Sequence, residues 1–155
     1  MITNNVTRFL DSKKVAYIAF EHSAEITSAE ESAAALNVPL EMIYKSIVVL
    51  REKPGKPILA VVPGTQKVSL KAVASAVGEK KVHLSTQVEA EQLTGLQAGG
   101  ISPIALINKG FTILLDSSAQ HHEQIHVSGG QRGLSLRISV KTLIEVTNAK
   151  VAPLT

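Results

Sequence analysis

Lys45 is the residue whose type and position are best suited to chemistry. It follows Tyr44 and precedes residues 46–50, an uncharged run of apolar and β-branched residues that predicts a strand buried on both faces. A lysine at the end of such a strand either carries its amine along the strand edge to solvent or points its ammonium into a pocket. In a pocket it would hold a phosphate or a carbonyl oxygen. Position alone leaves both alternatives open.

Two glycine-rich segments are the second candidates for a site. They are the 99–103 loop, Gly99-Gly100-Ile101-Ser102-Pro103, and the 128–133 loop, Ser128-Gly129-Gly130-Gln131-Arg132-Gly133. Adjacent glycines adopt backbone conformations closed to other residues, leave room for a ligand close to the chain, and let successive amides form an anion-binding nest. One such loop is typical of a turn, whereas two of them together with a lysine favour a small polar pocket.

Several other chemistries lack their signatures in this sequence. It contains no cysteine, which excludes disulfides, thiolate metal sites and a cysteine nucleophile. Its five histidines lack the spacing of a metal site. The phosphate-binding P-loop, the dinucleotide-binding turn and the nucleophile elbow of α/β-hydrolases do not occur either. We therefore expect neither a metal nor a cofactor.

The composition is that of one folded domain with a slight excess of positive charge. Of the 155 residues, 45% are hydrophobic and 19% charged, which supplies a core. The formal net charge of +3 permits an anionic partner without requiring one, and four lysines at 67, 71, 80 and 81 are opposed only by Glu79. No apolar stretch approaches the ~20 residues that span a bilayer, and the first residues do not resemble a secretory signal. We therefore expect a soluble, cytoplasmic protein without membrane contacts.

Helical periodicity, capping residues and β-branched runs predict alternating elements along the whole chain. Helices are expected at residues 6–14, 28–36, 69–77, 87–94 and 140–146. Strands are expected at residues 15–20, 46–50, 58–62, 81–84, 104–107, 111–116, 124–127 and 134–138. This mixed order predicts a single compact α/β (α+β) domain over residues 1–155, with a mixed central sheet flanked by helices.

Three blocks of the sequence resemble the signatures of the YbaK/EbsC proteins, which belong to the YbaK/prolyl-tRNA synthetase-associated editing domains. The blocks are residues 44–49, the 99–103 loop and residues 127–134. Their order and separation agree with that family, and the resemblance covers essentially the whole chain. It implies the fold of that editing domain and the hydrolytic or lyase-like removal of a mischarged amino acid from tRNA. In the YbaK branch this is typically cysteine on tRNA(Pro) or tRNA(Cys).

The resemblance also implies roles for individual residues. Lys45 matches the essential polar residue of the family's pocket, and the backbone of Gly100, Ile101 and Ser102 would surround the aminoacyl carbonyl and the terminal adenosine. No enzyme nucleophile is assigned in the YbaK branch, where the substrate's own thiol is thought to attack its ester. Further substrate contacts are expected from Phe20, Tyr44, Ser46, Gly99, Pro103, Ser128, Gly129, Gly130 and Arg132.

The sequence departs from the YbaK pattern at three places. Ser46 stands where threonine is usual, an aromatic residue expected near Ser28 is missing, and Ser135 replaces the acidic residue usual in the last strand. The amino acid that is removed therefore stays open. One alternative is alanine, or another small amino acid, on tRNA(Pro), for which water or the ribose 2′-hydroxyl would be the nucleophile. Another is a non-catalytic module that binds tRNA or a synthetase.

The expected partner is a mischarged tRNA, above all Cys-tRNA(Pro), with prolyl-tRNA synthetase as a second partner by family analogy. The lysines at 67, 71, 80 and 81 would contact tRNA phosphates, which give affinity without a sequence signature. The expected oligomeric state is a monomer.

Overall fold

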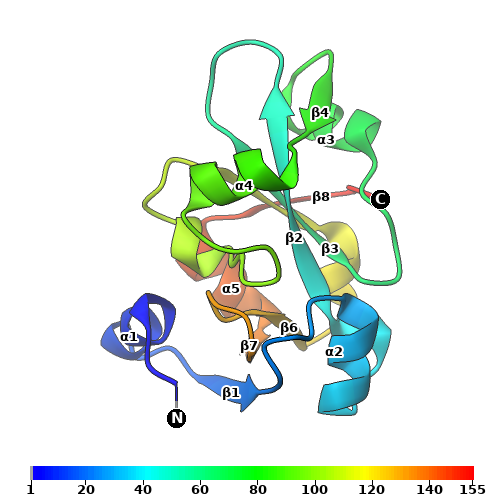
Figure 1. Cartoon of the computed structure of the whole chain (residues 1–155). Coiled ribbons are helices and arrows are strands. Elements are labelled where there is room, and N and C mark those ends of the chain that lie inside the picture. Colours follow the sequence, from blue (N-terminus) through cyan, green and yellow to red (C-terminus); the bar gives the residue numbers. More distant parts are fainter. Residues whose placement is uncertain (1) are drawn as a thin grey trace.

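Helices and strands alternate along residues 2–155, the part of the chain that the computed structural model describes (Figure 1). The strands are β1 (Tyr17–Glu21), β2 (Tyr44–Arg51), β3 (Ile58–Pro63), β4 (Val82–Leu84), β5 (Thr112–Asp116), β6 (Gln124–Ser128), β7 (Leu134–Ser139) and β8 (Lys150–Ala152). The α-helices are α1 (Asn5–Ser12), α2 (Ala29–Leu36), α3 (Leu70–Val77), α4 (Gln87–Thr94) and α5 (Val140–Thr147). Short 3₁₀ helices are η1 (Leu40–Met42), η2 (Ile104–Leu106) and η3 (Ser117–His121).

The strands form two sheets. The larger has the order β4-β2-β3-β5-β8, and the smaller has the order β1-β7-β6. In the larger sheet β2 pairs antiparallel with β3 and β4, whereas the β3–β5 and β5–β8 pairs are parallel. The smaller sheet is antiparallel throughout. The predicted α/β class with a mixed sheet is therefore confirmed. The strand pattern of the sequence does not predict that the strands divide into two sheets.

Polar side chains determine where the helices begin. The N-cap residues are Asn4, Ser28, Ser69, Thr86 and Ser139, and each accepts a hydrogen bond from a backbone N–H of the first turn. Such caps satisfy amides that have no partner within the helix, so the helix starts are encoded locally in the sequence. Ser28, which caps α2, accepts the Glu31 N–H at 3.1 Å.

Two hydrophobic cores lie on the two faces of the five-stranded sheet. Leu59 and Val61 of β3 pack in the core shared with the three-stranded sheet, whereas Ala60 and Val62 pack against Val73 of α3. Side chains alternate across a strand, so β3 is buried on both faces, as its uninterrupted apolar run predicts. The two cores hold β2 and β3 in place, and these strands form a rigid support for the candidate site.

Three sequence expectations are corrected by the structure. Residues 104–107 form the turn η2 rather than a strand, because Pro103 already has helical dihedrals and the Ser102 hydroxyl accepts the Ile104 N–H. The strand β8 was not expected, since three residues are too few to show a period. Lys45 is the second residue of β2 and does not precede it. No helix within residues 2–155 is long and apolar enough to cross a bilayer.

Candidate functional site

A cavity of about 280 Å³ lies where β2 of the larger sheet and β6 of the smaller sheet diverge. Ile43, the residue before β2, forms an isolated parallel bridge with His126 of β6. The lining residues come from the start of α2, from β2, from the 99–103 loop, and from β6 and β7. They are His22, Ile26, Thr27, Ser28, Ala29, Ser32, Ile43, Tyr44, Lys45, Ser46, Ile47, Ala98, Gly99, Ile101, His126, Val127, Ser128, Leu134 and Ser135.

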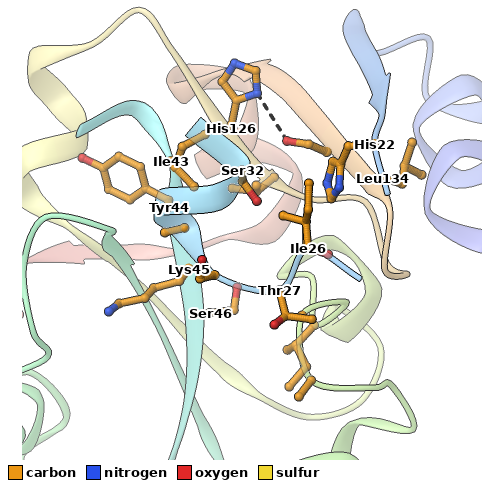
Figure 2. Close-up of a pocket in the computed structure, with 18 of the residues that line it drawn as sticks. His22, Ile26, Thr27, Ser32, Ile43, Tyr44, Lys45, Ser46, His126 and Leu134 are labelled. Atoms are coloured by element: carbon orange, nitrogen blue, oxygen red, sulfur yellow. Dashed lines mark hydrogen bonds between the residues drawn. The ribbon is translucent and has the colours of Figure 1, made fainter. Parts of the chain in front are cut away.

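The register of β2 gives Lys45 and Ser46 different surroundings. Lys45 pairs with Val62 and lies on the α3 face of the sheet, whereas Ser46 lies on the face of the three-stranded sheet. Both side chains are half-buried. Figure 2 shows the Lys45 side chain extending away from Thr27 and Ser46. Lys45 lines the cavity and forms no ion pair with any residue in 2–155, so no carboxylate of that part of the chain neutralises its charge.

Backbone groups of β2 also face the cavity. The Ile43 carbonyl accepts a hydrogen bond from the Gly64 N–H at 2.7 Å. In an antiparallel pair the backbone groups alternate between the two edges, so those of Tyr44 and Ser46 point away from β3. On that side β4 pairs only with residues Val49 to Arg51. The first half of β2 therefore presents polar backbone groups to the cavity beside Lys45.

The Tyr44 side chain anchors this part of β2 on the sheet face opposite to that of Lys45. Its hydroxyl lies 2.8 Å from the Ser118 hydroxyl, which donates to the Asp116 carboxylate. The same carboxylate accepts the Leu154 N–H at 2.8 Å. Burial raises the pKa of the Tyr44 phenol, so the phenol is neutral and serves as an anchor and not as a base.

The two glycine-rich loops pack directly against each other. A Cβ at Gly100 would lie 2.9 Å from the Gln131 Cα and 3.0 Å from the Arg132 nitrogen, so only glycine allows this approach. The Arg132 Nε donates to the Ala98 carbonyl at 2.7 Å, which ties the loops together. The Gly100 N–H donates to the Gln97 carbonyl at 2.8 Å and is thus occupied within the loop. The loops form one wall of the cavity.

The structure brings some of the predicted site residues to the cavity and places others behind it. Tyr44, Lys45, Ser46, Gly99, Ile101 and Ser128 line it. Gly100, Ser102, Pro103, Gly129, Gly130, Arg132 and Phe20 do not. Ser102 is fully buried and its hydroxyl is used within η2, while Phe20 packs behind the lining, with its ring 5.4 Å from the His126 ring. These residues support the walls of the cavity.

His126 is a pocket residue that sequence reasoning did not single out, and it lies beside Ser135, which the sequence marked only as a departure from the family pattern. The Arg137 Nε–H donates to His126 Nε2 at 3.1 Å, so the imidazole proton must sit on Nδ1, which lies 3.3 Å from the Ser135 hydroxyl (Figure 2). Burial, together with the Arg137 charge, lowers the pKa of His126 to about 4. His126 therefore donates to Ser135 and cannot take a proton from it. In a strand over residues 124–127 the side chain of His126 points to the face opposite Ile125 and Val127, but the sequence gives no sign that this face borders a cavity.

The cavity thus offers a cation, backbone groups and hydroxyls, but no activated nucleophile. None of its nineteen lining residues is Asp or Glu, and within residues 2–155 no three His, Cys, Asp or Glu side chains are grouped as a metal site. Such a site acts by positioning a substrate and by stabilising negative charge that develops on it. This chemistry suits transfer of an acyl group whose nucleophile comes from the substrate or from water.

Comparison with known proteins agrees with this fold. The sequence profile of the aminoacyl-tRNA editing domain matches residues 23–146, and the chain belongs to that family. It is 35% identical over 153 residues to EbsC of Enterococcus faecalis, a candidate Cys-tRNA(Pro)/Cys-tRNA(Cys) deacylase, covering 97% of this chain and 92% of EbsC. The resemblance to the YbaK/EbsC proteins is therefore confirmed.

Two further matches connect the chain with prolyl-tRNA synthetase. A proline–tRNA ligase of Limosilactobacillus fermentum is 26% identical over 125 residues, which cover 74% of this chain and 21% of the ligase. The crystal structure of a candidate trans-editing enzyme for prolyl-tRNA synthetase superposes with a TM-score of 0.81 at 25% identity, covering 100% of this chain and 99% of that one. A hypothetical protein, APE2540, shares the fold with a TM-score of 0.90 at 24% identity, covering 97% and 99% of the two chains.

Proposed function

We propose that the protein is a trans-editing deacylase that removes cysteine from mischarged tRNA(Pro), and also from tRNA(Cys). The observation that carries the proposal is the cavity between β2 and β6, which Lys45 lines together with Tyr44 and Ser46. Membership of the editing-domain family and the similarity to EbsC support it. The protein acts as a monomer in this proposal, with prolyl-tRNA synthetase as a partner that supplies the mischarged tRNA.

The size of the cavity fits the aminoacyl end of a tRNA. Ligand pockets usually measure ~300–1,000 Å³, and this cavity of about 280 Å³ is at the lower end. It accepts a small side chain with its ester, while the rest of the tRNA stays outside. Lys45, at the lining, would hold the ester region or the terminal phosphate, and Ile101 and Gly99 would contact the terminal nucleotide.

The reaction needs no nucleophile from the protein when the substrate brings a thiol. The cysteine sulfur attacks its own ester carbonyl, a carbon–sulfur bond forms, and the bond to the ribose oxygen breaks. The thiol proton passes to the ribose oxygen, and the products are a cyclic thiolactone and the free tRNA. The protein contributes orientation and stabilises the oxyanion of the intermediate with Lys45 and backbone N–H groups. The neutral, fully engaged His126 agrees with this scheme, because it leaves Ser135 unactivated.

The tRNA body would lie against the half of the molecule that carries the five-stranded sheet. Residues 43–116 and 150–155 contain ten basic and five acidic side chains, a net charge of +5. Residues 2–42 and 117–149 contain six basic and eight acidic side chains, a net charge of −2. Lys67, Lys71, Lys80 and Lys81 are exposed around α3, and Glu79 there is paired with Arg51. Phosphates are attracted to such a surface whatever the tRNA sequence.

A deacylation assay tests the proposal. The purified protein is incubated with Cys-tRNA(Pro), Cys-tRNA(Cys), Ala-tRNA(Pro) and Ser-tRNA, and the remaining charged tRNA and the released product are measured. We expect loss of cysteine and recovery of a thiolactone. If only alanine is released, the substrate is Ala-tRNA(Pro) and not Cys-tRNA(Pro). If the product is open cysteine, the reaction is hydrolysis and not cyclisation. If no charged tRNA is cleaved, the protein is a binding module.

A further inference from the structure

The 128–133 loop lies between the 99–103 loop and helix α1. On one side Gly100 packs against the backbone of Gln131 and Arg132. On the other side a Cβ at Gly130 would lie 2.7 Å from a methyl carbon of Val6 in α1. The position of the cavity wall formed by Ala98, Gly99 and Ile101 therefore depends on how the 128–133 loop is held from the side of α1.

Asn4 holds the loop on that side. Its Nδ2 donates to the Gly129 carbonyl and to the Gln131 Oε1, both at 2.9 Å. Its Oδ1 accepts the Thr7 N–H at 3.0 Å and thereby caps α1. These contacts fix the orientation of the amide, because an amide N–H group can only donate a hydrogen bond and an amide oxygen can only accept one. Asparagine is the N-cap residue that meets all of these demands at once.

We infer that Asn4 is a positioning residue for the cavity, acting through the 128–133 loop on the 99–103 loop. Asn4 does not line the cavity and lies outside residues 23–146, which the family profile matches. The connection is continuous: Asn4 binds Gly129 and Gln131, the Gln131–Arg132 backbone contacts Gly100, and Arg132 binds Ala98 at the cavity. This inference rests on the proposed deacylase function only where its test measures activity.

The substitution Asn4→Asp separates positioning from helix capping. Aspartate caps a helix as well as asparagine does, so α1 keeps its start. A carboxylate cannot donate, so it repels the Gly129 carbonyl, and it forces the Gln131 amide to turn from acceptor to donor. The matched control is Asn5→Asp, which makes the same change at the next residue, whose exposed side chain accepts a hydrogen bond from Arg8 and has no side-chain hydrogen bond to the 128–133 loop in the described residues. Both variants should melt within a few degrees of the parent protein.

The measurements are kcat and KM for Cys-tRNA(Pro), together with the backbone amide signals of Gly99 and Gly100 in NMR spectra. We expect Asn4→Asp to lower kcat/KM about tenfold, mainly through kcat, because small displacements of positioning groups have effects of this size or larger. The amide signals of Gly99 and Gly100 should shift. In Asn5→Asp kcat/KM should stay within about twofold and the signals should not move. Adding Gln131→Lys to Asn4→Asp supplies an ion pair and should restore part of kcat.

Full kcat/KM in Asn4→Asp, with unmoved Gly99 and Gly100 signals, would overturn the inference. If Asn4→Asp does not fold, Gln131→Ala removes one contact without touching the cap and should shift the same signals. If the parent protein cleaves no aminoacyl-tRNA, the proposed function fails, whereas the amide signals still decide whether Asn4 positions the 99–103 loop.

Discussion

The two sheets contribute to the cavity in different ways. The five-stranded sheet supplies Tyr44, Lys45 and Ser46 from one continuous strand that is buried between two cores. The three-stranded sheet supplies His126, Ser128 and Ser135, together with the 128–133 loop that supports the opposite wall. One sheet thus carries the cation on a rigid strand, and the other carries neutral hydrogen-bonding groups whose placement depends on contacts between distant segments. The five-stranded sheet should therefore control the chemical step, and the three-stranded sheet should control the shape of the cavity.

Lys45→Ala tests the contribution of the five-stranded sheet and should have the largest effect. Removing one charge-stabilising group from an acyl-transfer site lowers kcat by about 10²–10³, and we expect kcat for Cys-tRNA(Pro) to fall by this factor. Single-turnover deacylation measures it. Lys53→Ala, which removes an exposed lysine of the β2–β3 hairpin, is the matched control and should retain full kcat. A Lys45→Ala protein as active as the control would remove Lys45 from the reaction.

Gly100→Ala tests the contact between the two loops. The added Cβ would lie 2.9 Å from the Gln131 Cα, in a place where only backbone could yield. Forcing extra atoms into packed regions costs about 1–3 kcal/mol, and urea unfolding should show a loss of this size in the free energy of unfolding. Gly55→Ala places a Cβ equally close to a side-chain atom of Arg51 and should cost less. Equal losses in both variants would show that the loop contact tolerates displacement.

The same comparison explains which features could be predicted from the sequence. Residues 46–50 of β2 and the positions of α2 and α5 depend on neighbouring residues, so local patterns predicted them, although they placed Lys45 before the strand and not within it. The support of the cavity wall depends on the Asn4–Gly129 contact, 125 residues apart, and on the Arg132–Ala98 contact, 34 residues apart. No local pattern encodes such pairs. His126 could be assigned to a strand face, but only the divergence of β2 from β6 turns that face into a cavity.

The pH dependence of stability tests the burial of His126. Its pKa is about 4 in the folded protein and about 6.5 when unfolded, so between these values only the unfolded chain binds the proton. The free energy of unfolding should therefore be highest above pH 6.5 and decrease as the pH falls towards 4. A change on the order of 3 kcal/mol is expected from this group, since each unit of pKa difference corresponds to about 1.4 kcal/mol. Urea unfolding at several pH values measures it.

His126→Gln should flatten the pH dependence between 6.5 and 4, whereas His83→Gln, at an exposed position of β4, should leave it unchanged. An unaltered slope in His126→Gln would mean that other groups cause the acid sensitivity. The comparison separates a histidine held neutral by burial and by the Arg137 charge from one at an exposed position.

Charge reversal on the two halves tests where the tRNA lies and should have the smallest effect. In Lys71→Glu, on the exposed side of α3, we expect KM for Cys-tRNA(Pro) to rise about three- to fivefold at unchanged kcat, because one phosphate contact is lost. The slope of log affinity against log salt should fall by about 1. Lys141→Glu makes the same change in α5, on the half with net negative charge, and should leave the slope unaltered. If both variants lower the slope equally, the excess charge acts only at long range, and the tRNA does not rest on α3.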